Sequence, residues 1–492
     1  MTKPAANQET APHLHKTLRW YDGIALALGV PTGLFATVGY TTGALGAWAA
    51  IAIFGAAALI AVLQNLLFAE MASMFPDKPG GIALFGHEGW KRYVPSAGAV
   101  ATFGYWMGWS LTLGFIGLTI GNIAQAQWFA SSTGHFTLLG NQVGLPQWIA
   151  VGTIVLAWLL NVLGIKVAAG VNRVLAAVFA AVLVILGVGG FLHGHWHAAN
   201  LSWHVADWKT AIVWLYIAGW VAYGSELCAT FGPEFRDGAK DTSRALKASA
   251  VLSFASFVVV PMGVSGAIGE KAIANNPVGY ASVAADQILG GGGNAVTVVI
   301  LAAFFLMMVS SSADASRALY GLAVDDMTIK QLGVLNRFGV PSRALGVDCL
   351  VNIAIVLLVS SPLGVLLASN LGYILSIVIA LIGYILLRRD RPTHLREISV
   401  GPAGTPLAVL LTVVNAVMLV VGVTNPHLAG YGGAKETLIG VGLLSCSLLL
   451  LGYRRLVQDA SERRTATGVD VGELAAEDVF VAREHQTPHH LG

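Results

Sequence analysis

The stretch Trp220-Val-Ala-Tyr-Gly-Ser-Glu226 places a carboxylate inside an apolar segment that runs from Ala211 to Ala229. A charged side chain at the centre of a lipid bilayer costs about 2.5–3.5 kcal/mol even on the mildest scale. Such a residue therefore needs a partner, a proton or a function. Gly224, two residues before Glu226, favours an interruption of the helix at the same place. A broken apolar helix that carries an acid is typical of a solute site inside a membrane protein.

The composition predicts an all-α polytopic membrane protein. Of the 492 residues, 55% are hydrophobic and only 11% are charged, whereas soluble domains average about 25% charged residues. Long runs without Asp, Glu, Lys or Arg cover residues 23–69, 93–165, 174–206 and 349–387. Each exceeds the roughly 20 residues that a spanning helix needs. The alternating pattern of a membrane barrel is absent. The net charge of +2 says nothing about partners, and no nucleic-acid partner is expected.

The apolar pattern predicts twelve membrane-spanning helices. Their approximate bounds are 23–46, 49–72, 95–130, 146–165, 168–192, 211–234, 246–268, 288–327, 343–360, 364–388, 403–425 and 437–456. With this count, all but three of the 28 Lys and Arg residues lie on the side of the termini, and only Lys209, Lys271 and Lys435 lie opposite. The positive-inside rule then places both termini in the cytoplasm of a cell whose plasma membrane the protein spans. The polar N-terminus predicts no cleavable signal peptide.

The chain divides into a tail (1–20), a transporter domain (21–456) and a charged, disordered C-terminal tail (457–492). Residues 23–192 and 211–388 form two similar halves, and helices 11 and 12 (403–456) are extra. Each half opens with an interrupted helix, at Gly29-Val-Pro-Thr-Gly33 and at Ala222-Tyr-Gly-Ser-Glu226. Because each half holds an odd number of helices, the two halves are predicted to have opposite orientations. Paired interruptions of this kind indicate a binding site at the middle of the membrane.

The two interruptions suggest an amino-acid site. Pro31 forces the first helix open, so amides at Thr32–Leu34 are expected to bind an anion. Carbonyls at Leu28–Val30 and Ala218–Ala222 are expected to attract an ammonium group. The alternative is a packing kink without a ligand. The predicted substrate-binding residues are Val30, Pro31, Thr32, Gly33, Leu34, Trp220, Ala222, Tyr223 and Gly224.

Several motifs in order along the chain carry a family resemblance. They are Gly33-Leu-Phe35, Ala69-Glu-Met-Ala-Ser-Met-Phe-Pro76 with Pro79-Gly-Gly81, Glu226 with Pro233-Glu-Phe-Arg-Asp237 and Arg244-Ala-Leu246, Ser316-Arg-Ala-Leu-Tyr320, Asp325-Asp326, and Leu335-Asn-Arg-Phe-Gly-Val-Pro341. This set resembles the amino acid–polyamine–organocation permeases. The resemblance implies a LeuT-type fold with a 5+5 inverted repeat, secondary transport and, most often, amino-acid substrates.

The sequence also departs from that family. Ile82-Ala-Leu-Phe85 stands where tyrosines are common, and the proline expected after Asp325-Asp326 is missing. Some proton-coupled relatives place a lysine in helix 5. Here no lysine lies between Val174 and Leu192, and Phe179 is the nearest match in spacing. The driving ion is therefore left open by the resemblance.

Glu226 has two interpretations: it binds the coupling proton, or it caps freed amides and holds the break open. Trp106 and Trp109 in helix 3 are candidates for an aromatic lining, with ordinary packing as the alternative. Ser310 and Ser311 in helix 8 are candidates for a cation site with helix 1 carbonyls, as in sodium-coupled relatives of the fold. Back-bonded hydroxyls are the alternative.

Other polar residues are given structural interpretations. Asp314 is expected to form an ion pair with Arg317 on the same helical face. The cluster of His193, His195, His197 and His204 is expected to consist of ordinary loop residues, so no metal is predicted.

The sequence therefore predicts a secondary active transporter for an amino acid, working by alternating access and coupled to protons. No Walker loop, nucleophile elbow or zinc motif is present, so neither an enzyme nor a cofactor is expected. The expected partners are a small-molecule substrate and the lipid bilayer. One alternative is a polyamine or cationic amino-acid carrier or exchanger. Others are a receptor with a transporter fold, and a proton-pump subunit, which would need lysines inside the bilayer.

Overall fold

The computed structural model describes residues 16, 18–27, 29–76, 78, 80–163, 168–359, 361–392, 396–430 and 433–461. Most of the predicted tails, 1–15 and 462–492, lie outside the described residues, as does Leu28. The described part is almost entirely helical. Its two strands, β1 (His135–Leu138) and β2 (Asn141–Gly144), pair as an antiparallel hairpin.

Nine helical segments of the described residues are long and apolar enough to cross a bilayer. The protein is thus a polytopic all-α membrane protein. The segments comprise α3 (Ala47–Met74), α5 with α6 (Pro95–Ser110, Thr112–Trp128), α7 (Leu145–Val162), α9 with the 3₁₀-helix η2 (Trp208–Tyr223, Gly224–Glu234), α10 (Gly238–Ile268), α13 (Gly293–Val324), α15 (Pro362–Asp390), η4 with α16 (Gly401–Ala403, Gly404–Thr424), and α17 with η6 (Ala434–Tyr453, Arg454–Gln458).

The three remaining predicted spans are also helical, although the first is interrupted and the last has only 17 residues. They correspond to α1 with α2 (Trp20–Ala27, Thr32–Leu45), α8 (Ala168–Leu192) and α14 (Ser342–Leu358). Twelve spans therefore stay a prediction. Short helices connect the long ones: α4 (Gly81–Trp90), η1 (Ala198–Asn200), α11 (Glu270–Asn275), α12 (Tyr280–Leu289), η3 (Lys330–Gly333) and η5 (Pro426–Ala429).

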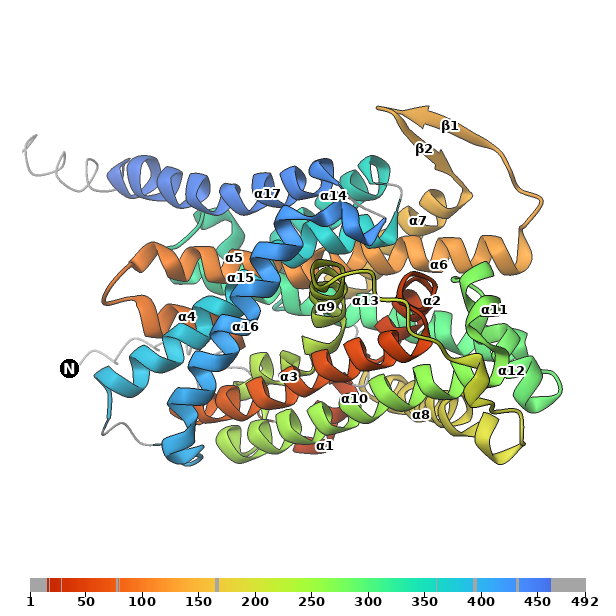
Figure 1. Cartoon of the computed structure of the whole chain (residues 1–492). Helices are drawn as coiled ribbons and strands as arrows, with labels where there is room; N and C mark the ends of the chain where they lie inside the picture. The colour runs from red at the N-terminus through yellow and green to blue at the C-terminus, as the bar shows by residue number, and fades with distance from the viewer. Residues whose placement is uncertain are drawn as a thin grey trace, which may run out of the picture.

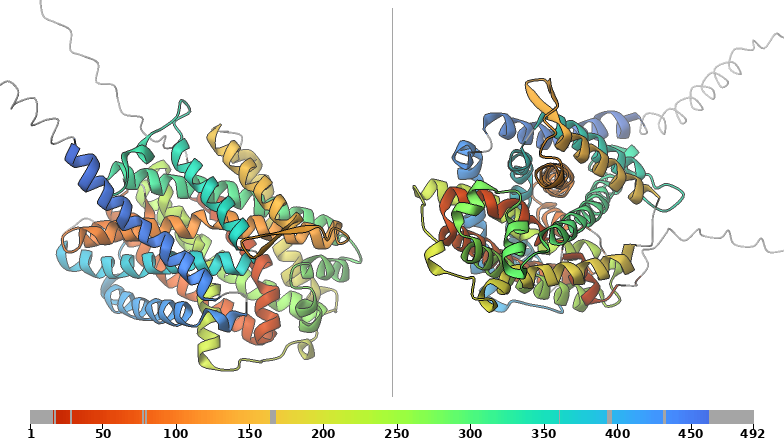
Figure 2. Two further views of the ribbon diagram at one scale, coloured as in Figure 1. Left: turned by 90° about the horizontal axis from the view of Figure 1, so that it is seen from above. Right: turned by 90° about the vertical axis from the view of Figure 1, so that its right-hand side faces the viewer.

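The connections gather at two ends of a helical bundle. The β1–β2 hairpin, α11 and α12 lie together on the right of Figure 1, and α4 lies on the left. We name these the hairpin end and the α4 end. Figure 2 (right) looks along the bundle from the hairpin end. Lys435 ties this end together, because its Nζ donates to Asn141 Oδ1 at 2.9 Å and to the Leu358 carbonyl at 2.6 Å.

Helix α15 runs through the interior and approaches two other helices closely at glycines. A Cβ added to Gly104 of α5 would lie 2.4 Å from the carbonyl oxygen of Gly372 in α15. One added to Gly89 of α4 would lie 2.4 Å from Cα of Gly383. Only glycine permits such contact between helix backbones, which is a common means of helix association in membranes. The position of α15 beside the site described below is thereby fixed.

A buried carboxylate joins α3 to α15 at the α4 end. The Glu70 side chain is completely buried, and Arg388 grips it with two hydrogen bonds, Nε to Oε1 at 3.0 Å and Nη2 to Oε2 at 2.7 Å. Tyr384 Oη and the Val400 amide also donate to Oε2, at 2.9 and 2.8 Å. Arg396 Nε lies 3.5 Å from Oε1. The carboxylate is therefore well compensated, as buried charges require.

A second ionic cluster lies on α4 itself. Glu88 accepts from Lys78 at 2.7 Å and from Arg391 at 3.0 Å, and it pairs with Lys91 at 2.7 Å. Burial acts to raise the pKa of Glu88, but the hydrogen bonds from Lys78 and Lys91 outweigh it and lower the pKa to about 2. The charged form of Glu88 thus helps to hold α4 against the end of α15.

Candidate functional site

The first interruption lies between α1 and α2, where the chain forms a tight turn. Helix α1 ends at Ala27 and α2 begins at Thr32, directly after Pro31. The amides of Thr32, Gly33 and Leu34 each donate to the carbonyl three residues earlier, at 3.1 Å. The Thr32 hydroxyl also donates to the Gly29 carbonyl at 2.5 Å.

The expectation of free amides at Thr32–Leu34 is therefore wrong. The chain passes the proline through 3₁₀-type turns, and these turns use the amides that full unwinding would have released. The carbonyls of Gly29 and Val30 are engaged in the same turns. An anion would have to compete with these hydrogen bonds for the amides.

The second interruption is a change of helix type. Helix α9 ends at Tyr223, and the chain continues from Gly224 to Glu234 as the 3₁₀-helix η2. The sequence predicts a break at Gly224, whereas the structure shows a continuous but more tightly wound helix. Glycine allows the change because it has no side chain to crowd the neighbouring turn. Glu226 lies in the first turn of η2.

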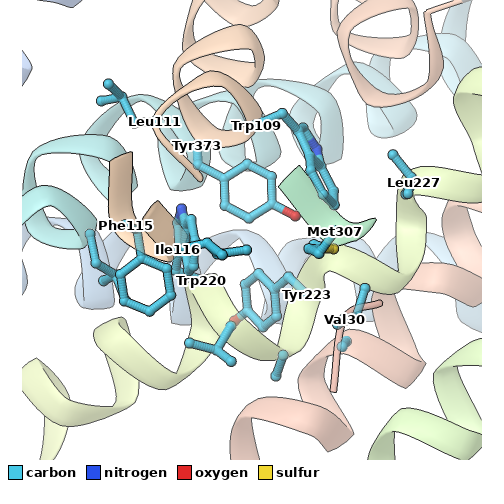
Figure 3. Packing of buried hydrophobic residues seen from close by; sticks show 14 of the residues in the cluster. Val30, Trp109, Leu111, Phe115, Ile116, Trp220, Tyr223, Leu227, Met307 and Tyr373 are labelled. Carbon is cyan, nitrogen blue, oxygen red and sulfur yellow. The ribbon is translucent and has the colours of Figure 1, made fainter. Parts of the chain in front are cut away.

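A cavity lies where these two interruptions meet, and the empty space between its atoms is about 380 Å³. The first interruption, α5, α6, α9, α13 and α15 all contribute to its wall. The lining residues are Val30, Thr32, Gly33, Gly108, Trp109, Thr112, Ile116, Trp220, Val221, Gly224, Met307 and Tyr373. Figure 3 shows Trp109 and Tyr373 side by side, with Met307 and Trp220 nearby.

Two wall residues hold Glu226. Tyr373 Oη donates to its Oε1 at 2.7 Å, and Trp109 Nε1 donates to the same oxygen at 3.3 Å. The rings of Trp109 and Tyr373 meet edge to face, with centroids 6.5 Å apart. Glu226 is 1% exposed, and its Oε2 has no hydrogen-bond partner among the described residues. A change of charge on Glu226 would therefore act directly on the cavity wall.

The structure places six of the predicted residues on this wall: Val30, Thr32, Gly33, Trp109, Trp220 and Gly224. Trp220 packs against Phe115 at 5.0 Å between ring centroids, and its Nε1 donates to Ser369 Oγ at 3.0 Å. The wall does not include Pro31, Leu34, Ala222, Tyr223 or Trp106. Tyr223 Oη instead donates to Met418 Sδ at 3.7 Å.

Trp106 serves a different part of the molecule. Its Nε1 donates to Asp348 Oδ1 at 2.7 Å, and its ring packs on Phe103 with centroids 4.6 Å apart. A lining role for Trp106 is therefore corrected to a contact between α5 and α14. Two positions of α5 three residues apart lie on one face, but only Trp109 reaches the level of the interruptions.

The other polar candidates are dispersed. Ser311 is buried and its hydroxyl has no partner among the described residues, whereas Ser310 is partly exposed. His204 Nε2 lies 2.5 Å from Ser202 Oγ and 3.7 Å from Glu270 Oε1. Within the described ranges, no three His, Cys, Asp or Glu side chains are grouped closely enough to hold a metal ion.

The expected ion pair between Asp314 and Arg317 does not form. Arg317 instead approaches Glu234 of η2, with 3.9 Å between its Nε and Oε1. Phe179, at the position of the helix 5 lysine in some relatives, is buried against Phe35 with ring centroids 5.8 Å apart.

Sequence reasoning missed Tyr373, whose hydroxyl makes the shortest contact with Glu226. It lies in an apolar run of α15, 147 residues after Glu226 in the chain. No local pattern distinguishes it from a packing tyrosine. Thr112, Ile116 and Met307 were missed for the same reason. Gly372, adjacent to Tyr373, indicates at most that α15 packs closely against another helix at this level.

The bundle and its interior cavity define a membrane transport protein, and comparison with known proteins supports this class. Residues 18–442 match the amino acid permease family, and the chain belongs to that family. It is similar to uncharacterized transporters of Mycobacterium tuberculosis and Mycobacterium bovis, with 24% identity over 281 residues. That alignment covers 56% of this chain and 58% of each relative. The amino-acid permease RocE of Bacillus subtilis is 23% identical over 362 residues, 69% of this chain and 72% of RocE.

Proposed function

We propose that this protein is a proton-coupled secondary transporter that moves an amino acid across the plasma membrane by alternating access. The observation that carries the proposal is the cavity at the two interruptions, whose wall residues Trp109 and Tyr373 hold the buried Glu226. A carboxylate in this place can bind a proton and change the hydrogen bonds of the wall as it does so. Membership of the amino acid permease family and the likeness to RocE support an amino-acid substrate.

The proposal includes the finer architecture. Twelve spans form a 5+5 inverted repeat, residues 23–192 and 211–388, followed by two further helices at 403–456. Residues 1–20 and 457–492 are cytoplasmic tails, so the α4 end faces the cytoplasm. The excess of Lys and Arg among the segments assigned to that side supports this orientation.

The cavity favours a small amino acid with an uncharged side chain. Its wall is mostly apolar, with Val30, Ile116, Val221 and Met307 among the lining residues. The hydroxyls of Thr32 and Thr112 donate to the carbonyls of Gly29 and Gly108, so on this wall they can serve as acceptors for the ammonium group of the substrate. A polyamine would leave its distal ammonium groups without a carboxylate on this wall.

The experiment is uptake by purified protein in liposomes. Amino acids and polyamines would be screened under separate proton, sodium and voltage gradients. We expect accumulation of a small amino acid when the proton gradient is imposed, and little response to sodium. If no amino acid binds or moves, the substrate assignment is wrong, and accumulation under sodium alone would refute proton coupling.

Glu226→Gln tests the coupling residue. Glutamine keeps the shape and can accept from Tyr373, but it cannot bind and release a proton. We expect uptake that no longer depends on pH, with facilitated movement down the solute gradient retained. Ser310→Ala, on a partly exposed position of α13, is a control that should keep the wild-type pH profile. Unchanged pH dependence in the Glu226 variant would assign it a structural role instead.

A further inference from the structure

Helix α13 buries a carboxylate that the site above does not use. Asp314 has 0% of its surface exposed, and neither of its oxygens has a hydrogen-bond partner among the described residues. Arg317, one turn later, donates Nη1 to the Ala313 carbonyl and faces Glu234 instead. A carboxylate buried without partners is costly in its charged form. Holding a proton removes most of that cost.

Two hydroxyls lie between Asp314 and Glu226. Tyr105 Oη and Thr230 Oγ1 are 3.2 Å apart, and both approach the Asp314 carboxyl without a hydrogen bond of good geometry. Thr230 lies in η2, four residues after Glu226. The Tyr105 ring packs against Tyr373, with centroids 6.4 Å apart, and Tyr373 donates to Glu226. The two acids therefore share one group of hydroxyls.

This group leads from the cavity toward the α4 end. Helix η2 runs from Glu226 at the cavity to Glu234, whose side chain is 21% exposed and faces Arg317, which is 40% exposed. The start of α4 lies against the middle of η2, since a Cβ on Gly81 would be 3.0 Å from Thr230 Oγ1. Asp314 thus lies between the cavity and partly exposed charges at one end of the bundle.

We propose that Asp314 is a second proton-binding residue, which relays the coupling proton between Glu226 and the α4 end through the hydroxyls of Thr230 and Tyr105. This inference rests on the proposed proton coupling at Glu226. In one transfer, the Asp314 carboxyl gives its proton to the hydroxyl pair of Tyr105 and Thr230, this pair passes a proton to the Tyr373 hydroxyl, and Tyr373 gives its own proton to the Glu226 carboxylate, to which it already donates. Asp314 ends charged and Glu226 neutral, with the hydroxyls restored. Asp314 regains its proton from water at the α4 end, where the partly exposed Glu234 carboxyl can bind and release a proton while Arg317 stays charged.

The groups that face Asp314 fit this role. Tyr105 reaches it from α5, Thr230 and Glu226 from η2, Asp348 from α14, and Arg317 from its own helix. Asp348 is also buried, but its Oδ1 accepts from Trp106 Nε1. Asp348 is therefore the matched control, because it is a buried acid near Asp314 that the proposed path through Tyr105 and Thr230 does not use.

The test separates proton movement from solute movement in liposomes that contain the full chain. Counterflow exchanges labelled for unlabelled amino acid at equal pH and needs no net proton transfer, whereas gradient-driven accumulation does. For Asp314→Asn we expect accumulation to fall about tenfold or more, as for loss of a proton-transfer group, with counterflow retained. Asp314→Glu should restore much of the accumulation. Asp348→Asn should accumulate substrate like the wild type.

Accumulation at the wild-type level by Asp314→Asn would overturn the relay. A folded Asp314→Asn variant that loses counterflow as much as it loses accumulation would also overturn it. If the Asn variant does not fold, Thr230→Val decides, because it removes the hydroxyl and keeps the shape. Slower proton-driven accumulation with normal counterflow supports the relay, and unchanged accumulation refutes it. If the wild-type protein itself shows no proton-driven accumulation, the proposed proton coupling fails together with the relay. The wild-type measurement therefore distinguishes failure of the coupling from failure of the relay alone.

Discussion

Replacing Arg388 with methionine should expose the dependence of the fold on the buried charge of Glu70. The substitution removes both short hydrogen bonds to the carboxylate, at 3.0 and 2.7 Å, and leaves Glu70 in its fully buried position. Removing one partner of a buried ion pair costs about 3–5 kcal/mol. Tyr384, the Val400 amide and the more distant Arg396 still face the carboxylate. We therefore expect a loss near the lower limit, about 3 kcal/mol.

A double-mutant cycle makes the prediction specific. Glu70→Leu alone leaves the guanidinium of Arg388 in a partly buried site, whereas Glu70→Leu with Arg388→Met removes both charges together. Apolar replacement of a buried ion pair is often neutral, so the double variant should be more stable than Arg388→Met alone. The coupling energy is expected to be about 2–3 kcal/mol.

The free energy of unfolding can be measured by titration with a denaturing detergent in mixed micelles, and thermal melting provides a second measure. Arg389→Met is the control, because this exposed neighbour pairs with Asp390 at the surface and should change stability little. Additive effects of the two substitutions, or an Arg388→Met variant as stable as the wild type, would refute the reasoning.

The remaining predictions concern the cavity wall and the α4 end. Gly33→Ala should reduce substrate binding in a folded protein, because the new methyl carbon would lie 2.6 Å from Val221 Cγ1 across the wall; Val221→Ala in the same chain should restore binding measured by calorimetry. Trp109→Phe keeps an aromatic ring at this position but removes the Nε1 donor to Glu226. The pH profile of uptake should therefore shift, while maximal uptake changes less. The pKa of Glu88 is lowered in the fold to about 2, so its stabilising charge is present above pH 4.5 and is lost as the pH falls from about 4.5 toward 2. Melting temperatures measured across that range should fall more steeply for the wild type than for Glu88→Gln, and parallel curves would show that the ion cluster does not stabilise the fold.

The sequence predicted the parts of the site that depend on local rules. Pro31 lacks the backbone donor that its helix needs, and an acid in an apolar run needs an explanation. Thr32, Gly33 and Trp220 followed because they lie within a turn or two of those features. Trp109 has no such local signal, since nothing in the nearby sequence distinguishes it from Trp106.

Other features depend on contacts that a single sequence does not contain. Tyr373 donates to Glu226, which lies 147 residues away in the sequence. Arg317 approaches Glu234, although Asp314 is closer to it in the sequence. The error over the Thr32–Leu34 amides has a different origin. The prediction treats an interrupted helix as an unwound one. In the structure, 3₁₀-type turns keep these amides hydrogen-bonded to the carbonyls three residues earlier, at 3.1 Å.

Because η2 is a 3₁₀-helix, the segment that contains Glu226 would become shorter if it changed to an α-helix. A 3₁₀-helix rises about 2.0 Å per residue and an α-helix about 1.5 Å. If the 11 residues from Gly224 to Glu234 rewound as α-helix, the segment would shorten by about 5 Å, and each successive side chain would turn back by about 20°. Glu226 would then swing away from Tyr373 while Glu234 was drawn toward the cavity. A screw motion of this kind needs no hinge, since rotation and shortening arise from one change in winding.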